Sequence, residues 1–244
     1  MADTTQLTTP TQLTIAKRFC GPNNSGNGGY SCGLLAQFVD GPATVRLRYP
    51  PPLDVAMHVE PEQDTWLLKH DDQVIAQAKP WQVDIAPPPP VNFATAQQAA
   101  QHYFGFQKHL YPNCFVCGTE RTAGDALCIY AGAAADNLVA APWQPHSSLC
   151  SNKNNEGEID RIYLWAAMDC PGAYTFLPRS DKAILLGELS ATILRPVLAH
   201  EQCVVTGTYL QQEGRKHVVA TAIYRQSGEM AAFAKGTWIE LQSI

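Results

Sequence analysis

Residues 162–171, Ile-Tyr-Leu-Trp-Ala-Ala-Met-Asp-Cys-Pro, decide the fold. Asp160 stands where it can cap a helix that begins at Arg161, and Pro171 followed by Gly172 ends that helix. The segment is apolar on nearly every side, and a helix of this kind is normally buried all round. We therefore expect 161–170 to be a central helix that other elements enclose.

The enclosing elements follow in the sequence. Long strand-like segments are predicted at 183–194, 202–211, 216–225 and 230–241. Gly214 and the pair Ser227–Gly228 mark the hairpins between them. One buried helix followed by an antiparallel meander indicates an α+β unit.

The first half of the chain has the same plan. Residues 30–39 are apolar and small, which predicts a short buried helix, and a Gly- and Asn-rich loop at 21–29 comes before it. Strands are predicted around this helix at 13–19, 43–49, 55–59, 64–70 and 73–85. In both halves the strand after the central helix ends in Arg, at Arg48 and Arg195, and reaches Pro within two residues. We interpret the chain as a duplicated unit rather than a solenoid, whose repeats are shorter and more numerous.

Four consecutive prolines, 87–90, mark the boundary between the two units. A tetraproline fits neither a helix interior nor a central strand, and it favours extended polyproline geometry. After it we expect a helix over 94–111 and strands at 126–131 and 137–142. The predicted domain organisation is a polar tail at 1–10, a first unit at 11–86, a Pro-rich linker with a connecting helix at 87–112, and a second unit at 113–244.

The composition argues against several classes of function. The 244 residues carry 17 Lys and Arg against 22 Asp and Glu, a net charge of −5, whereas nucleic-acid binding needs a basic surface. No run of ~18 apolar residues is present, so we expect no transmembrane helix and no membrane partner. The N-terminus has neither the basic nor the apolar region of a signal peptide. The eight cysteines then suit reduced thiols in a cytoplasmic protein.

A buried helix wrapped by an antiparallel sheet, twice in tandem, resembles the hotdog fold. Three segments carry the likeness: Gly-Asn-Gly-Gly at 26–29, Leu-Trp-Ala-Ala-Met-Asp-Cys-Pro at 164–171, and Cys-Phe-Val-Cys-Gly at 114–118. They are similar to features of hotdog acyl-CoA thioesterases. The resemblance covers about 12–243 in architecture, but only these segments in motif.

The resemblance implies a site between the helices of two adjacent hotdog units. One helix N-terminus would polarise the thioester carbonyl through backbone N–H groups, and the partner helix would supply a carboxylate. The family's usual segment is His-Gly-Gly, with Asp eight residues after the His. Here Asn27 holds the His position before Gly28 and Gly29, and Asp169 holds the carboxylate position in the second helix. One composite site is therefore expected, with Asn27, Gly28, Gly29 and Asp169 as catalytic residues.

The residue chemistry is compatible with these roles, and each residue also has a structural interpretation. A helix N-terminus presents free N–H groups and a positive dipole end, but Gly28 and Gly29 also suit tight packing. A carboxylate in an apolar helix is costly unless it is paired or functional, and Asp169 could instead pair with Arg161 or Arg179.

Four further residues are candidates for binding the substrate: Asn24, Arg46, Arg48 and Cys32. Asn24 could orient the substrate, although clustered Asn residues more often form turns. The two arginines could bind the phosphates of CoA. Cys32 lies on the first helix and could also be a nucleophile, although a buried Cys is usually inert.

Cys114 and Cys117 form a Cys-x-x-Cys pair that is half of a typical zinc site. No second Cys-x-x-Cys and no His-x₃₋₅-His completes it, so we predict no metal and interpret the pair as packing. We also expect no cofactor, with CoA entering only as part of the substrate.

We conclude that the sequence favours a thioesterase-like hydrolase that acts on an acyl-CoA or acyl-carrier thioester. The alternative is a non-catalytic hotdog protein that binds an acyl or aromatic ligand, as the Asn in place of His suggests. A hotdog dehydratase ranks last, because neither central helix contains the His that such enzymes need. The expected partner is a small-molecule acyl thioester, and a homo-oligomer remains open.

Overall fold

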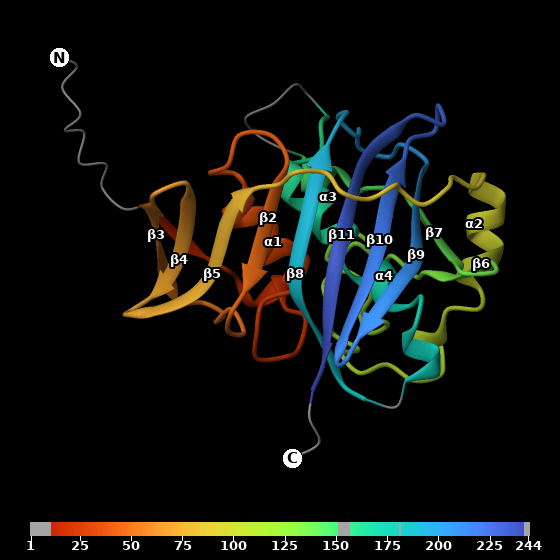
Figure 1. Ribbon diagram of the computed structural model, residues 1–244. Coiled ribbons are helices and arrows are strands. Elements are labelled where there is room, and N and C mark those ends of the chain that lie inside the picture. The colour runs from red at the N-terminus through yellow and green to blue at the C-terminus, as the bar shows by residue number, and fades with distance from the viewer. Residues whose placement is uncertain (1–10, 151–156, 181, 242–244) are drawn as a thin grey trace.

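The computed structural model describes residues 11–150, 157–180 and 182–241, and the predicted tail at 1–10 lies outside this part. One antiparallel sheet of eleven strands runs through the molecule in the order β1-β3-β4-β5-β2-β8-β11-β10-β9-β7-β6 (Figure 1). In the first half the elements are β1 (Thr11–Thr14), α1 (Gly28–Ala36), β2 (Ala43–Leu47), β3 (Ala56–Glu62), β4 (Thr65–His70) and β5 (Gln73–Pro80). In the second half they are α2 (Phe93–Ala100), β6 (Gly132–Ala135), β7 (Leu138–Trp143), α3 (Arg161–Ala167), α4 (Cys170–Ala173), β8 (Ile184–Ile193), β9 (Cys203–Glu213), β10 (Lys216–Tyr224) and β11 (Met230–Glu240).

The strand order is the same on both sides of the sheet's centre. Counting outward from β2, the first half has β5, β4, β3 and β1, and counting outward from β8, the second half has β11, β10, β9 and β7. β6 is added at the far edge of the second half. Two hydrophobic patterns of the same type have therefore produced two half-sheets of the same topology.

The two half-sheets join where β2 pairs with β8 in antiparallel register. The hydroxyl oxygens of Thr44 and Ser190 lie 2.7 Å apart in this seam and are buried. In the exposed part of the same seam, Arg46 Nε donates to Glu188 Oε2 at 2.8 Å. The sheet is thus continuous, and the two halves share one hydrophobic core.

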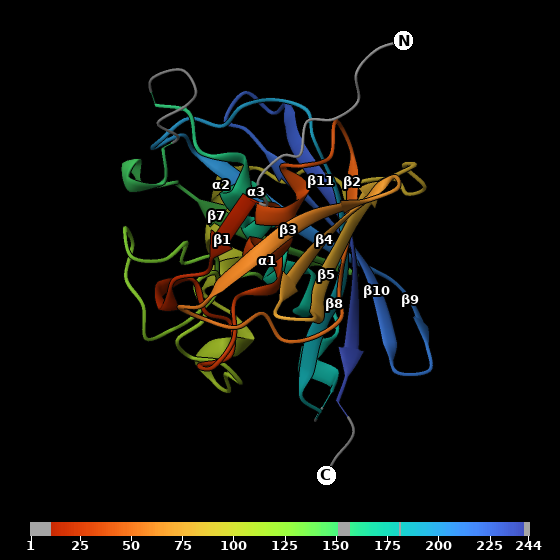
Figure 2. The same ribbon diagram turned by 90° about the vertical axis from the view of Figure 1, so that its left-hand side faces the viewer.

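The central helices α1 and α3 lie next to each other on one side of the sheet (Figures 1 and 2). Their backbones approach closely because α1 has Gly29 and Gly33 at the contact. A Cβ added at Gly33 would lie 2.9 Å from Trp165 Cβ and 3.0 Å from the backbone of Ile162, and side chains do not tolerate such distances. The close approach therefore depends on glycine.

The Pro-rich segment 81–92 crosses the other face of the sheet to reach α2 (Figure 1). Trp81 packs against Phe233, and the Tyr224 hydroxyl donates to the Pro88 carbonyl at 2.5 Å. As a result β10 is buried on almost its whole length, since the helices cover one face and this segment the other.

The structure corrects three predicted elements. The helix expected over 94–111 ends at Ala100. The strand expected at 126–131 is a loop in which Cys128 has φ 53°, and the strand begins only at Gly132. The helix expected over 161–170 ends at Ala167 because Pro171 cannot pack over the carbonyl of residue 167 or donate an N–H.

The remaining helix and strand predictions agree with the structure to within a few residues, with two exceptions. The strand expected at 13–19 is β1 followed by a 3-10 turn at Lys17–Phe19, and the strand expected at 73–85 ends at Pro80. No helix in the described ranges is long and apolar enough to cross a membrane.

We expect Gly33→Ala to destabilise the protein by about 1–3 kcal/mol, as overpacking of a core does. The added methyl group would force α1 and α3 apart. Urea unfolding measures the effect, and Gln37→Ala at the exposed end of α1 is the control. Equal stabilities of the two variants would contradict the role of this contact.

Candidate active site between the two central helices

The first half contributes the capped N-terminus of α1. Asn27 is the N-cap, and its Oδ1 accepts a hydrogen bond from the Tyr30 N–H at 2.9 Å. The preceding loop is rich in small residues, so the chain turns tightly into the helix without filling the space in front of it. Asn27 is only 2% exposed, and its side-chain amide Nδ2 points to the second half of the chain.

The second half contributes Asp169, at the break between α3 and α4. Asp169 Oδ2 accepts from Asn27 Nδ2 at 2.8 Å and from the Gly29 N–H at 2.9 Å. The other oxygen, Oδ1, is buried and has no hydrogen-bond partner among the described residues. Both hydrogen bonds thus go to one oxygen of the carboxyl group, and the other oxygen is left without a partner among the described residues.

Burial dominates the electrostatics of this carboxyl group. Desolvation raises the pKa of Asp169 from 3.8 to about 7, and the neighbouring Cys114 also raises it. The hydrogen bonds from Gly29 and Asn27 favour the charged form and lower the pKa in part. The group can thus exchange a proton near neutral pH, as a general base must.

A cleft with about 830 Å³ of empty space, its open mouth included, reaches Asp169. Its wall is formed by the loop before α1, the segment after β2 and the ends of β8 and β11. Most of this wall is apolar, with large side chains from Leu47, Tyr49, Tyr111, Ile184, Leu186 and Trp238. An apolar cleft that contains a few polar groups is typical of a small-molecule site.

Gly28 and Gly29 have different roles in the structure. The Gly29 N–H is engaged by Asp169, so it is not the free oxyanion donor that the sequence suggested. The Gly28 N–H has no partner within the described ranges, and Gly28 lines the cleft at the N-terminus of α1. Gly28 is therefore the amide that can meet a negatively charged oxygen there.

Of the residues expected to bind substrate, Arg48 alone lines the cleft, where it donates to Gln77 Oε1 at 2.7 Å. Asn24 is exposed on the turn before α1 and does not line the cleft. Arg46 is paired with Glu188 instead. Cys32 is fully buried, with Sγ 3.8 Å from the Val45 carbonyl, because it lies on the side of α1 that faces the sheet. The structure therefore places these three residues outside the cleft.

Two cysteines lie beside the carboxyl group: Cys114, which the sequence pattern suggested only as packing, and Cys170, which was not predicted as a site residue. Cys114 and Cys170 line the cleft, and Asn27 Nδ2 lies 3.8 Å and 4.0 Å from their Sγ atoms. Cys117 lies behind them, and the three thiols could hold a metal ion. Because Cys170 directly follows Asp169, the motif in 164–171 was the sequence signal that could have identified Cys170 as a neighbour of the site.

Comparison with known proteins identifies the fold. No protein-family model and no curated protein sequence matches the chain. Among solved structures it is similar to a TesB protein of Mycobacterium avium subsp. paratuberculosis, with a TM-score of 0.60, 9% identity, and coverage of 96% of this chain and 93% of that one.

Two further solved structures match over nearly the whole chain. A conserved protein of unknown function with a hot dog fold from Alicyclobacillus acidocaldarius has a TM-score of 0.61 at 10% identity, with 98% and 96% of the two chains covered. A proposed thioesterase II of Thermobifida fusca has a TM-score of 0.59 at 11% identity, with 96% and 92% covered. The expected α+β hotdog fold is therefore confirmed.

We expect Asp169→Asn to remove a pH dependence of stability. The raised pKa means that the folded state prefers the protonated acid, so its stabilising effect is complete below pH ~4 and lost as the pH rises to ~7. The free energy of unfolding of the wild type should fall over this range by roughly 4 kcal/mol relative to the variant, at ~1.4 kcal/mol per pKa unit.

Urea unfolding of both proteins in EDTA between pH 4 and pH 8 measures this difference. Because the other titrating groups are common to the two proteins, their effects cancel. A difference that stays constant with pH would show that Asp169 titrates normally.

Proposed function

We propose that this chain is a thioester hydrolase built from two fused hotdog units, and that it cleaves an acyl thioester in the cleft beside Asp169. One observation carries the proposal. The carboxyl group of the second half is fixed at the N-terminus of α1 in the first half, with Oδ1 unpartnered. The likeness to the thioesterase II structure of Thermobifida fusca supports the same function.

Asp169 would act as the general base. Its Oδ1 would accept a proton from a water molecule whose oxygen forms a bond to the thioester carbon. The carbonyl oxygen then carries the negative charge of a tetrahedral intermediate. When the C–S bond breaks, the proton on Asp169 passes to the departing sulfur, and the products are a carboxylic acid and a free thiol. No further reactant is needed.

Gly28 would stabilise the charged oxygen in this step. Its N–H is free among the described residues and lies at the end of α1 where the helix dipole is positive. A single preorganised donor of this type contributes ~3 kcal/mol to an acyl transfer. Gly29 and Asn27 would act through Asp169, as positioning residues.

The apolar lining of the cleft suits an acyl substrate. Its large apolar side chains would cover an acyl chain or an aromatic ring, and desolvation there would favour apolar groups. Arg48 is the exposed cation on its wall, where a phosphate of CoA could bind.

The duplicated chain would have one active site rather than two. At the opposite ends of the same helices, Asp160 caps α3 by accepting from the Ile162 N–H at 3.0 Å. The facing end of α1 is Ala36 followed by Gln37, so α1 supplies no carboxylate there. A fused pair can lose one of two sites, whereas a symmetric homodimer keeps both.

We expect the purified protein to hydrolyse members of an acyl-CoA panel and Asp169→Asn to lose at least ~100-fold in kcat, because no general base remains. Free CoA should be quantified by chromatography, since the eight cysteines would interfere with thiol dyes. Asp84→Asn, which removes an exposed carboxylate bound to Lys235, is the matched control.

Saturable binding of acyl-CoA with no release of CoA by the wild type would contradict hydrolysis. It would favour the alternative, a hotdog protein that binds an acyl ligand.

We expect Arg48→Ala to raise KM for acyl-CoA by about 2–5-fold and to leave KM unchanged for the matching acyl N-acetylcysteamine ester, which has no phosphate. Arg46→Ala is the control, because Arg46 lies outside the cleft and pairs with Glu188. An equal effect of Arg48→Ala on both esters would rule out a phosphate contact.

A further inference from the structure

Three cysteine thiols meet beside the cleft, from segments far apart in the sequence. Cys114 and Cys117 lie in the segment between α2 and β6, and Cys170 is the first residue of α4. All three are buried, and their Sγ atoms lie within 4.8 Å of one another. The thioester chemistry proposed above uses none of them.

The spacing of the sulfur atoms suits a metal ion. Zn²⁺ binds thiolate sulfur at ~2.3 Å in tetrahedral geometry, which places neighbouring sulfur ligands about 3.8 Å apart. Cys114 Sγ and Cys170 Sγ are 3.7 Å apart. One edge of the sulfur triangle thus already has the length that a tetrahedral site needs, and no edge is longer than 4.8 Å.

The surroundings of Cys114 favour its thiolate, the form that binds metals. Its Sγ accepts from the Val116 N–H at 3.4 Å and faces Asn27 Nδ2 at 3.8 Å. Hydrogen bonds from Cys117 and Cys170 hold the pKa of the Cys114 thiol well below its usual value, although burial acts in the opposite direction. A buried thiolate is costly without a compensating charge, and a cation would supply it.

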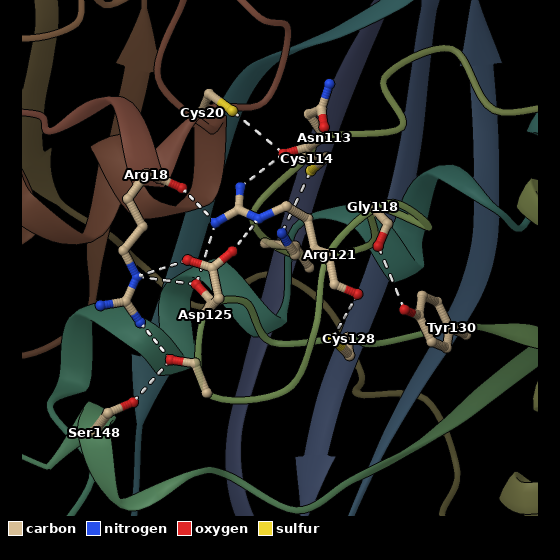
Figure 3. A network of polar contacts seen from close by, with 12 residues as sticks. Arg18, Cys20, Asn113, Cys114, Gly118, Arg121, Asp125, Cys128, Tyr130 and Ser148 are labelled. Atoms are coloured by element: carbon tan, nitrogen blue, oxygen red, sulfur yellow. Dashed lines mark hydrogen bonds and ion pairs between the residues drawn. The ribbon is translucent and has the colours of Figure 1, made fainter.

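The loop that carries Cys114 and Cys117 is held in place by a polar network (Figure 3). Arg121 donates to the carbonyl oxygens of Asn113 at 2.9 Å and Arg18 at 3.1 Å, and it pairs with Asp125. Its side chain is only 10% exposed. The loop is thereby tied to the first half of the chain, on one side of the thiols.

Two further side chains, from His109 and Tyr103, contact the carbonyl oxygen of Cys117. His109 Nε2 lies 2.9 Å and the Tyr103 hydroxyl 3.1 Å from this oxygen. His109 Nδ1 accepts from the Tyr111 N–H at 3.0 Å, so Nε2 carries the donated proton. Such outer contacts orient the ligands of a metal centre and preserve their geometry.

We propose that Cys114, Cys117 and Cys170 together bind one thiophilic metal ion, for which Zn²⁺ has the matching geometry. Cys114 and Cys170 line the cleft, so the fourth ligand position would face it and take a water molecule. Binding releases the protons of the thiols that are not yet ionised. The proposal does not depend on thioester hydrolysis, because the three thiols would bind metal in an inactive protein as well.

The experiment uses the full chain, reduced, freed of metal and then dialysed against Zn²⁺. We expect one Zn²⁺ per chain by mass spectrometry of the metal, and a melting temperature that rises with Zn²⁺. Cys170→Ser should retain less than about a tenth of the metal at the same free Zn²⁺, since two thiolates rarely suffice. Cys203→Ser is the matched control, because Cys203 is also a buried cysteine, in β9, but lies outside the cluster.

Substitution with Co²⁺ tests the wild type alone, so the result holds even where a variant fails to fold. A tetrahedral site with thiolate ligands gives strong visible d–d bands and a sulfur-to-cobalt charge-transfer band in the near ultraviolet. Absence of these bands would overturn the proposal. So would a stoichiometry well below one, or equal metal loss in Cys203→Ser. A Cys114–Cys117 disulfide that persists in the reduced protein by peptide mass would also overturn it.

Discussion

The close contact between α1 and α3 is the constraint on which the rest of the structure depends. It exists because Gly29 and Gly33 present no side chain to the backbone around Ile162, Trp165 and Ala166. A methyl group at Gly29 would lie 2.5 Å from Asp169 Cβ, so the same absence of a side chain also admits the carboxyl group. One packing requirement therefore brings the two halves together and places the functional group of one half on the helix end of the other.

The buried carboxyl group is costly for the fold and useful for chemistry. Its two hydrogen bonds offset only part of the desolvation, as the raised pKa of Asp169 records. A protein under selection for stability alone would have an apolar residue here, as α1 does at Ala36 on the opposite side. The two ends of the helix pair therefore differ in chemistry, with a buried carboxyl group at one end and an apolar side chain at the other.

Most of the fold could be predicted from local patterns, and the site in part. Buried helices and paired strands follow from apolar periodicity, and Asp169 was conspicuous as a charge in an apolar helix. Long-range geometry was not accessible in this way. Cys170 meets Cys114 and Cys117 only because Pro171 breaks the helix after Ala167, and Cys32 lies in the core because of which side of α1 meets the sheet. Arg46 pairs with Glu188, which lies 142 residues further along the sequence, and local patterns do not reveal such a pair.

Asn27 stands where hotdog thioesterases usually have His, and its contacts give this difference a physical explanation. Asn27 uses its carbonyl oxygen to cap α1 and its amide to hold Asp169, so both ends of one short side chain are occupied. An amide does not titrate near neutral pH, and it can therefore position the carboxyl group but cannot share its proton. In the proposed mechanism the proton is therefore accepted by Asp169 and not by Asn27. Within the described residues, Oδ1 of this carboxyl group is buried and has no hydrogen-bond partner, so it is the oxygen that a water molecule in the cleft would have to contact.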